Sequence, residues 1–315
     1  MNMLVQRFRI LVRVPMVAAL SLGATSIANA QLTPDPLYHY QFTSDYSNSG
    51  TSSGGTFTTI NAIGPKPTEI KITDHVLDLT GNTNRSDPYS SRWLSSENNN
   101  VGTLNQFTVT FWVKSTDLNG YQTVFAAGTD PSFTRYSTNQ FSIRLVSGKI
   151  QATINGPTSL SATTLFNAEA ALTSGEWTFI AVSYDGTSSL RSNSTAQEAA
   201  TGDSSNLQLY RGDESSESSI SRSGIGFGTV DNAAASPGTI ALGSTSTFYV
   251  GSITDETTIF NGELSDLRVY DSILTPTQVN EIRLSNIPEP SSSTAVLSVL
   301  VALGFVVFRR KRSLR

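Results

Sequence analysis

Apolar and polar residues alternate along several short segments of the chain. In Phe107–Lys114 (FTVTFWVK) every second residue, beginning with the first, is apolar, so an extended strand here would have one apolar face. The segment FSIRLVSGKIQATI contains two such runs on either side of Ser147-Gly148, a dipeptide typical of a two-residue hairpin turn. These patterns predict antiparallel β-strands.

Similar short runs recur along much of the chain. We predict further strands at Tyr38–Phe42, Val76–Leu79, Gln122–Ala126, Trp177–Tyr184, Leu207–Tyr210, Thr239–Leu242 and Leu264–Tyr270. Turn dipeptides follow several of these runs or other strands: Asn119-Gly120, Asn155-Gly156 and Asp185-Gly186. Many short antiparallel strands joined by such turns predict an all-β sandwich.

One helix is predicted near the end of this region, in LTPTQVNEI. Thr275 is a suitable N-cap, Pro276 occupies the first helical position, and Gln278 completes a capping box. Val279 and Ile282 would face the sheet. We expect a helix of about two turns.

The N-terminus has the three parts of a secretory signal peptide, which predicts a signal over residues 1–30 and a mature chain from Gln31. The alternative is a retained N-terminal membrane anchor. The three parts are a basic region, an apolar run and a small-residue cleavage pattern, at Arg7–Arg13, Val14–Gly23 and Ala28–Ala30.

The C-terminus has the pattern of a membrane segment followed by a stop signal. Ala295–Phe308 is almost entirely apolar. Basic residues come directly after it: Arg309, Arg310, Lys311, Arg312 and Arg315. By the positive-inside rule these charges stay in the cytoplasm and the preceding domain lies outside. The alternative is a buried core helix, which the terminal cations disfavour.

The region between these ends is acidic, with 24 Asp and Glu residues against 13 Lys and Arg residues in 31–287. Such a domain repels nucleic acid and anionic lipid, so neither is an expected partner. The chain has no cysteine, which excludes disulfides and thiol chemistry. Two Ser-rich stretches, 187–206 and 212–237, bury little apolar surface and are interpreted as mobile insertions or as part of a ligand site.

Four segments in order carry a family resemblance: FTVTFWVK, GEWTFIAVSYDG, LQLY and GELSDLRVYDSILTPTQVNEI. Together they resemble the laminin-G-like group of the concanavalin A-like lectin/glucanase superfamily. The resemblance implies a two-sheet antiparallel jelly roll with one short C-terminal helix over residues 31–286. It also implies a binding function, and we expect a non-catalytic module for carbohydrate or extracellular matrix.

The C-terminal region 287–315 has a second resemblance. Pro288, Glu289 and Pro290, followed by the apolar run and the basic residues, resemble the PEP-CTERM sorting signal. The resemblance implies an exosortase as processing partner and a Gram-negative-type bacterium. It implies a precursor held transiently in the inner membrane by its C-terminal helix, and a product at the cell surface or in the extracellular matrix.

Catalytic carboxylates of the glucanase type are not apparent in the sequence. Retaining glucanases of this superfamily use a Glu-x-Asp-x-x-Glu strand, and retention needs two carboxyl groups about 5 Å apart. The nearest segment here is Glu263–Asp266, and no Glu follows at the required position. We therefore predict a protein that is not an enzyme. A structural or adhesive surface protein without a small ligand is the alternative, and a glycoside hydrolase is less favoured.

Candidate ligand-binding residues are aromatic side chains in or near predicted loops, because sugars stack on exposed rings. They are Tyr89, Trp93, Tyr121, Tyr136 and Tyr249, for each of which packing is the alternative; Trp112 and Trp177 are assigned to packing. Related jelly rolls often hold a structural Ca²⁺, and oxygen ligands for one are available at Asp45, Asp130, Asp255 and Asp266. Ser265 stands where the family's closing motif has its first acid.

Overall fold

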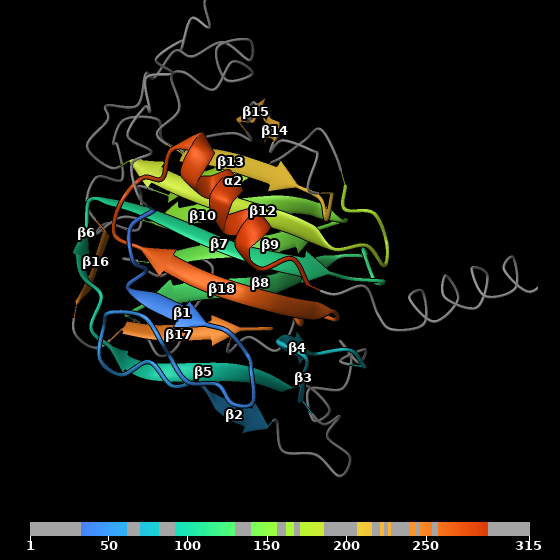
Figure 1. The fold of residues 1–315 in the computed structure, drawn as a ribbon, viewed down its shortest axis with the longest axis horizontal. Coiled ribbons are helices and arrows are strands. Elements are labelled where there is room, and N and C mark those ends of the chain that lie inside the picture. Colours follow the sequence, from blue (N-terminus) through green and yellow to red (C-terminus); the bar gives the residue numbers. More distant parts are fainter. Residues whose placement is uncertain are drawn as a thin grey trace, which may run out of the picture. The chain divides into compact units, whose positions relative to one another are not determined.

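The computed structural model describes residues 33–61, 70–81, 92–129, 140–155, 162–166, 171–185, 207–215, 221–223, 226–227, 240–243, 246–253 and 258–288 (Figure 1). The predicted signal peptide, the apolar run at 295–308 and the basic residues after it lie outside these ranges. Within the described residues, no helix has the length and apolar character needed to span a membrane.

The first sheet, called sheet A here, has eight strands, and its described ladders are antiparallel. Its order is β14 (Ser221–Ser223), β13 (Leu207–Gly212), β12 (Thr178–Asp185), β7 (Gln106–Lys114), β18 (Glu263–Tyr270), β4 (Val76–Asp78) and β3 (Lys71–Thr73), with β1 (Tyr38–Tyr40) also paired to β18. The first described strand of the chain therefore pairs with the last.

The second sheet, sheet B, is also antiparallel and eight-stranded. Its order is β15 (Gly226–Phe227), β11 (Ala162–Phe166), β10 (Lys149–Asn155), β9 (Gln140–Val146), β8 (Tyr121–Gly128), β17 (Ser246–Val250), β5 (Arg92–Asn99) and β2 (Thr58–Asn61). Two short strands, β6 (Gly102–Leu104) and β16 (Ile240–Gly243), form a separate ribbon.

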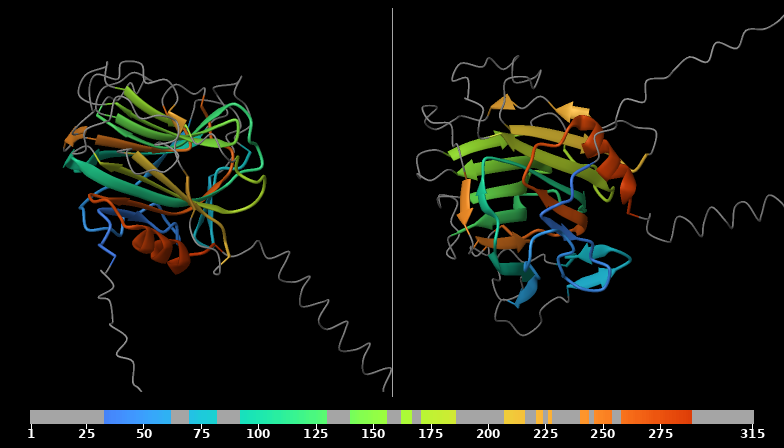
Figure 2. Two further views of the ribbon diagram at one scale, coloured as in Figure 1. Left: turned by 90° about the horizontal axis from the view of Figure 1, so that it is seen from above. Right: turned by 60° about the vertical axis from the view of Figure 1, so that its left-hand side comes forward.

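The two sheets stack face to face, as the left view of Figure 2 shows. The core between them is rich in aromatic rings. Phe125 makes edge-to-face contacts with Phe141 and Phe248, at centroid distances of 5.6 and 5.5 Å, and all three rings are buried. The predicted all-β, two-sheet antiparallel sandwich is confirmed.

Helix α2 (Pro276–Ser285) covers the outer face of sheet A (Figure 2). Its capping box forms as predicted: the Thr275 hydroxyl accepts a hydrogen bond from the Gln278 backbone N–H, and the Gln278 side chain accepts one from the Thr275 N–H. Val279 and Ile282 pack with Trp112, Trp177, Phe179, Tyr210 and Tyr270. The interpretation of Trp112 and Trp177 as packing residues is confirmed, since both are buried.

The predicted strands are confirmed, with shifts of at most two residues at their ends. Ser147 and Gly148 form the predicted hairpin turn, with φ angles of +50° and +75°. Eight of the described strands were not predicted: β2, β3, β5, β6, β11, β14, β15 and β17. Of these, β2, β5 and β17 have sequences that are rich in Ser, Thr and Asn and lack a clear apolar alternation.

The folded body continues past helix α2 into the predicted sorting motif. Ile287 packs against the Trp112 cluster, and Pro288 is buried. Glu289 and Pro290 lie outside the described residues. The boundary predicted at residue 286 therefore lies two residues before the end of the described body.

Candidate functional site

The outer face of sheet B, which points away from the core, can be read from the strand register. Directly opposed residues of an antiparallel ladder share a face. One row of opposed residues crosses five adjacent strands and comprises Ser95, Tyr249, Ala126, Ser142 and Thr153. The residues next to them along the strands, such as Phe248, Phe125 and Ile143, belong to the core cluster. This row therefore lies on the side of the sheet opposite the core.

We call this surface the sheet-B face. On its four central strands it is formed by Tyr121, Thr123, Ala126, Gly128, Gln140, Ser142, Arg144, Val146, Lys149, Gln151, Thr153, Thr247 and Tyr249. Hydroxyl and amide side chains dominate, and none of these residues is acidic. Most of these residues are buried: Thr123, Ala126, Gln140, Ser142, Arg144, Gln151, Thr247 and Tyr249 are each at most 9% exposed, whereas Tyr121 and Lys149 are exposed and Val146 and Thr153 are partly exposed. Among them, Tyr121 therefore offers the exposed ring on which a sugar could stack.

Three of the five candidate aromatic residues lie on this face, but their exposures differ. Trp93 and Tyr249 lie in strands β5 and β17, not in loops, and pack with Ala126 and Ile253. Only 6% of Trp93 and 4% of Tyr249 is exposed, so neither ring has the open face that we predicted. Tyr121, the first residue of β8, is 51% exposed. Tyr89 and Tyr136 lie outside the described residues.

The turn before Tyr121 is held by a buried side chain. The Gln122 amide nitrogen donates to the backbone oxygens of Asp117 and Asn119, at 2.6 and 3.2 Å, and its oxygen accepts from the Asn261 N–H at 3.0 Å. Ser147 N–H donates to the Gly120 oxygen at 2.9 Å, which joins this turn to the β9–β10 hairpin. Hydrogen bonds from the side chain of Gln122 and from the β9–β10 hairpin therefore hold the backbone that carries the exposed Tyr121 ring.

The hairpin turn itself packs closely. A Cβ atom added to Gly148 would lie 3.2 Å from Leu118 Cβ and 3.3 Å from Ala171 Cβ. The Leu172 N–H donates to the Gly148 oxygen at 2.8 Å. These contacts fix the ends of β9 and β10, so Val146 and Lys149 lie in a defined row beside Tyr121.

Sequence reasoning missed the polar members of the sheet-B face, among them Arg144, Lys149 and Gln151. A signal for them was present, because in FSIRLV and KIQATI these residues alternate with the core residues. Alternation places them together on one face of a sheet. It carries no information about which neighbouring strands complete that face.

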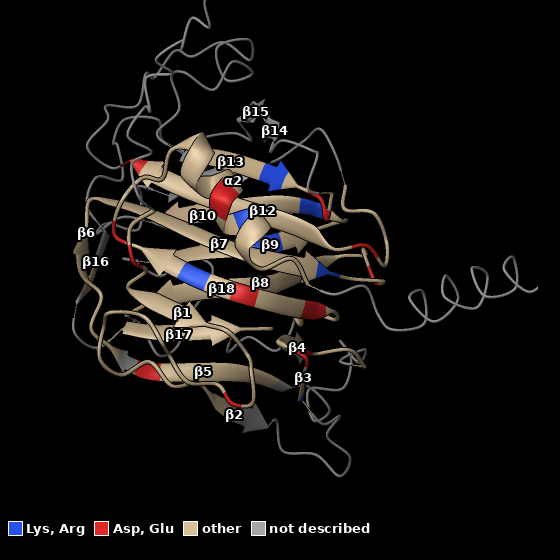
Figure 3. Cartoon of the chain, viewed as in Figure 1, with Lys and Arg blue, Asp and Glu red and all other residues tan. Residues whose placement is uncertain are grey.

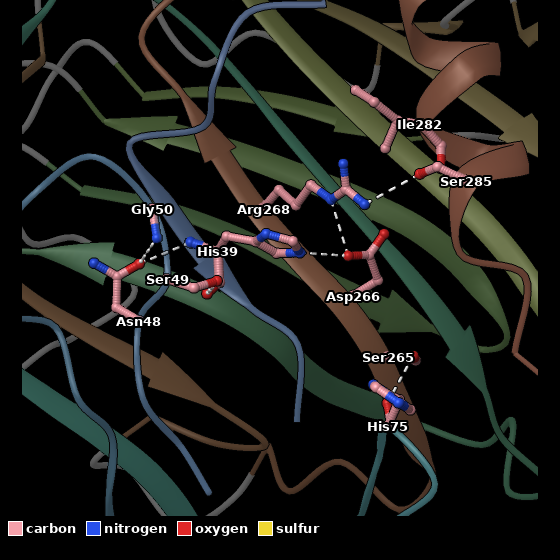
Figure 4. A network of polar contacts seen from close by, with 10 residues as sticks. All are labelled: His39, Asn48, Ser49, Gly50, His75, Ser265, Asp266, Arg268, Ile282 and Ser285. Atoms are coloured by element: carbon pink, nitrogen blue, oxygen red, sulfur yellow. Dashed lines mark hydrogen bonds and ion pairs between the residues drawn. The ribbon is translucent and has the colours of Figure 1, made fainter. Parts of the chain in front are cut away.

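A second polar cluster, centred on Asp266, lies on sheet A (Figure 4). Asp266 Oδ1 lies 2.7 Å from His39 Nε2 and 2.9 Å from Arg268 Nε. Arg268 also donates from Nη2 to the Ser285 hydroxyl of α2 at 3.2 Å. Asp266 has a φ of +52° at an irregularity in the pairing of β18 with β7, and this bulge gives the carboxylate its position.

The Asp266 carboxylate is fully buried. Burial by itself would raise its pKa, but the hydrogen bond from His39 and the guanidinium of Arg268 outweigh this effect and lower the pKa. The carboxylate thus stays ionised because two nitrogen groups compensate it. Its other oxygen, Oδ2, is buried and has no hydrogen-bond partner among the described residues.

Asp266 as a calcium ligand stays a prediction: its Oδ1 is occupied by one basic side chain and one histidine, and its Oδ2 has no partner among the described residues. Asp45 is exposed, and its Oδ1 accepts from the N–H and the hydroxyl of Ser47 in a local turn. Asp130 and Asp255 lie outside the described residues. Among the residues that are described, no three His, Asp or Glu side chains are close enough to share a metal ion.

The acids of β18 are both engaged in ion pairs, and Figure 3 shows the acidic and basic positions along this strand. Glu263 Oε2 lies 2.8 Å from Lys114 Nζ, and Asp266 is held by His39 and Arg268. A retaining glycosidase would need two carboxyl groups facing one sugar, one of them free to act as a nucleophile. The Glu263–Asp266 segment does not have this arrangement.

Comparisons with known proteins concern the fold. No curated protein matches the chain. Among solved structures, domain 4 of AbnA, a GH43 extracellular arabinanase from Geobacillus stearothermophilus, in complex with arabinotriose, is 20% identical, with a TM-score of 0.48 over 79% of this chain and 98% of that one. A heptameric SAP-like pentraxin from Limulus polyphemus is 18% identical, with a TM-score of 0.38 over 60% and 74%.

The ligand-binding domain of botulinum neurotoxin serotype D, in complex with N-acetylneuraminic acid, is 13% identical, with a TM-score of 0.44 over 80% of this chain and 51% of that one. The TM-scores of these three likenesses are all below 0.5. A family model gives the more specific result. Residues 89–218 match the concanavalin A-like lectin/glucanases superfamily, which confirms the predicted resemblance for this segment.

Proposed function

We propose that this protein is a non-catalytic carbohydrate-binding module, and that it binds its ligand on the sheet-B face around Tyr121. The segment that matches the lectin/glucanase family, 89–218, includes β5 and β8 to β11, which are five of the strands of sheet B. The proposed surface is thus built largely from the part of the chain with the family match.

The observation that carries the proposal is the exposure of Tyr121 on a fixed backbone, in one row with the partly exposed Val146 and the exposed Lys149. A phenol ring has an apolar surface for the C–H groups of a sugar ring and a hydroxyl that stays in water. The hydrogen bonds of the Gln122 side chain and the close packing of Gly148 hold the backbone at Tyr121 in place. A preorganised ring loses little conformational entropy when a ligand binds, which favours affinity.

The proposal includes delivery to the cell surface. We infer from the sequence that residues 1–30 direct export and that the Pro288–Pro290 motif, the apolar run and the basic residues form an exosortase-processed sorting signal. The test is intact-mass measurement of the protein isolated from its native cells. We expect a chain that begins at Gln31 and lacks the C-terminal basic residues. A chain that retains residues 309–315 contradicts the processing.

The binding proposal is tested with the purified full chain against a panel of neutral and charged polysaccharides, by affinity electrophoresis. Saturable retardation by one class of glycan supports the carbohydrate-binding module. Binding to no member of the panel contradicts it and favours a structural or adhesive matrix protein. Reducing-sugar release is measured in the same samples, and release from any β-glucan contradicts the non-catalytic assignment.

A further inference from the structure

Three polar atoms on the outer face of sheet A are buried and have no hydrogen-bond partner among the described residues. They are Asp266 Oδ2, Thr110 Oγ1 and Trp112 Nε1. The three residues that carry them are fully buried. A buried polar atom without a partner destabilises the folded state, so native proteins pair such atoms with protein groups or with ordered water. Each of the three atoms therefore calls for a partner.

The strand register places these three side chains at neighbouring positions. Thr110 and Trp112 are alternate residues of β7, so they share one face of the strand. The residues opposed to them on β18 are Arg268 and Ser265, respectively, and Asp266 lies between those two, where the register shifts. Trp112 packs with residues of α2, which makes this the outer face of the sheet. Opposed side chains have Cβ atoms about 5 Å apart, so one small molecule can bridge these positions.

The Asp266 carboxylate has protein partners at one of its two oxygens. His39 Nε2 and Arg268 Nε lie 2.7 and 2.9 Å from Oδ1. Figure 4 shows that both contacts reach this one oxygen and that Oδ2 points away from His39. An oxygen of an ionised carboxylate accepts hydrogen bonds and cannot donate one. Oδ2 therefore needs a donor other than His39.

The three atoms have complementary roles in hydrogen bonding. The Trp112 indole N–H is a donor only, Asp266 Oδ2 is an acceptor only, and the Thr110 hydroxyl can do either. A water molecule between them accepts from Trp112, donates to Asp266 Oδ2 and shares a third hydrogen bond with Thr110. Buried waters in proteins make about three hydrogen bonds to groups that are otherwise unsatisfied. This set of groups thus matches the requirements of one water.

The charges around Asp266 favour a neutral molecule over a cation. Its carboxylate is already compensated by the guanidinium of Arg268, whose Nε lies 2.9 Å from Oδ1. A further cation would add an uncompensated buried charge, which is strongly unfavourable. Ca²⁺ takes about six to eight oxygen ligands, whereas these groups offer the oxygens of Asp266 and Thr110 and the N–H of Trp112, which repels a cation.

We propose that one ordered water molecule is bound by Asp266 Oδ2, Thr110 Oγ1 and Trp112 Nε1, on the face of sheet A that α2 covers. This water links β18 to β7 through side chains, and it supplies the donor that the ionised carboxylate needs at Oδ2. The carbohydrate surface proposed above lies around Tyr121 on sheet B, so neither proposal depends on the other.

A crystal structure of the purified protein tests the proposal directly. We expect electron density for one water, with distances of about 2.7 to 3.2 Å to the three polar atoms. Crystals grown with calcium are measured as well, and a calcium ion with ligand distances of about 2.3 to 2.6 Å would overturn the choice of water. A direct hydrogen bond between Trp112 Nε1 and Asp266 Oδ2, or no ordered molecule in contact with the three atoms, would overturn the site.

A double-mutant cycle tests the shared water in solution, by urea unfolding. Thr110→Val and Trp112→Phe each remove one partner of the water, and each should raise the equilibrium constant for unfolding at least about fivefold. The two side chains make no direct hydrogen bond, so a coupling between them reports a molecule that both of them bind. We expect the effect of the double variant to be at least about threefold smaller than the product of the single effects.

The control pairs Thr110→Val with Trp177→Phe. Trp177 belongs to the same aromatic cluster as Trp112 but is not a proposed partner of the water. The effects of this pair should multiply to within about twofold. Multiplicative effects in both pairs would overturn the shared water, and so would equal coupling in both, since packing would then be its cause. If a variant fails to fold, the crystal structure of the wild type decides.

Discussion

His39 Nε2 lies 2.7 Å from Asp266 Oδ1, and this contact joins two residues that are 227 positions apart in the sequence (Figure 4). His39 lies on β1, the first described strand, and Asp266 lies on β18, the last. The backbones of the two strands are paired as well, with His39 opposed to Arg268. The first and last described strands are thus joined by backbone pairing, and the buried Asp266 carboxylate adds a side-chain contact between them.

We expect Asp266→Asn to lower the free energy of unfolding by about 3 to 5 kcal/mol, because it leaves the Arg268 guanidinium without its buried counter-charge. Asparagine tolerates the φ of +52° at this position, so backbone strain should not add to the loss of stability. The check is urea unfolding, with the exposed Asp271→Asn as a control that should change stability by less than about 0.5 kcal/mol. Similar values for the two variants would contradict a stabilising role of the cluster.

Stability should depend on the ionisation of Asp266. Its pKa is lower in the folded state than in the unfolded chain, so its contribution is fully present above the unfolded value of about 3.9 and is lost as the pH falls through the folded pKa. We expect the stability difference between the wild type and Asp266→Asn to shrink as the pH falls below about pH 4. Urea unfolding of both proteins across this range measures it. A difference that persists unchanged to pH 2.5 is not compatible with this account.

The capping box of α2 provides a local test of the helix that covers sheet A. Thr275→Ala removes the hydroxyl that accepts from the Gln278 N–H and should cost about 0.5 to 2 kcal/mol. Thr277→Ala, two residues later at an exposed helical position, removes the same atoms without a cap. We expect it to be neutral or slightly stabilising in thermal unfolding. Equal losses of stability in the two variants would contradict the capping interpretation.

The hairpin that supports the Tyr121 row can be tested through glycine substitutions. Gly148 and Gly102 both have positive φ, +75° and +69°, so alanine is strained at either position. Only at Gly148 would the new Cβ approach other side chains, Leu118 and Ala171, whereas at Gly102 nothing lies within 4 Å. We therefore expect Gly148→Ala to cost about 1 kcal/mol more than Gly102→Ala in chemical denaturation. If Gly102→Ala cost as much, the hairpin would not be held by the packing described.

The elements with a clear pattern were predictable from the sequence. The hairpin of β9 and β10 and the capped helix α2 each have local signals, alternation around a turn dipeptide and a capping box, and both form as predicted. The polar strands β5 and β17 lack such signals, and their place in sheet B is determined by pairing with distant segments. The local propensity of a segment does not show which distant strands will pair with it.

The candidate site was only partly predictable for the same reason. Trp93 and Tyr249 appeared to be loop aromatics because their surroundings are rich in Ser and Thr, yet pairing between β5 and β17 brings them together and buries them. Asp266 appeared to be a metal ligand within a family motif. Its partner His39 is at the other end of the domain, and the bulge that orients its carboxylate leaves no trace in the sequence.

The central claim, that carbohydrate binds on the sheet-B face, is tested most directly by the dissociation constant of Tyr121→Ala for the glycan that the panel identifies. Leu284→Ala is the control, because Leu284 is 39% exposed on α2, at the outer face of the opposite sheet. We predict that Tyr121→Ala weakens binding by about 30-fold, the loss of about 2 kcal/mol expected for a central aromatic contact, with Leu284→Ala unchanged. Wild-type affinity in Tyr121→Ala, or an equal loss in both variants, would contradict the account.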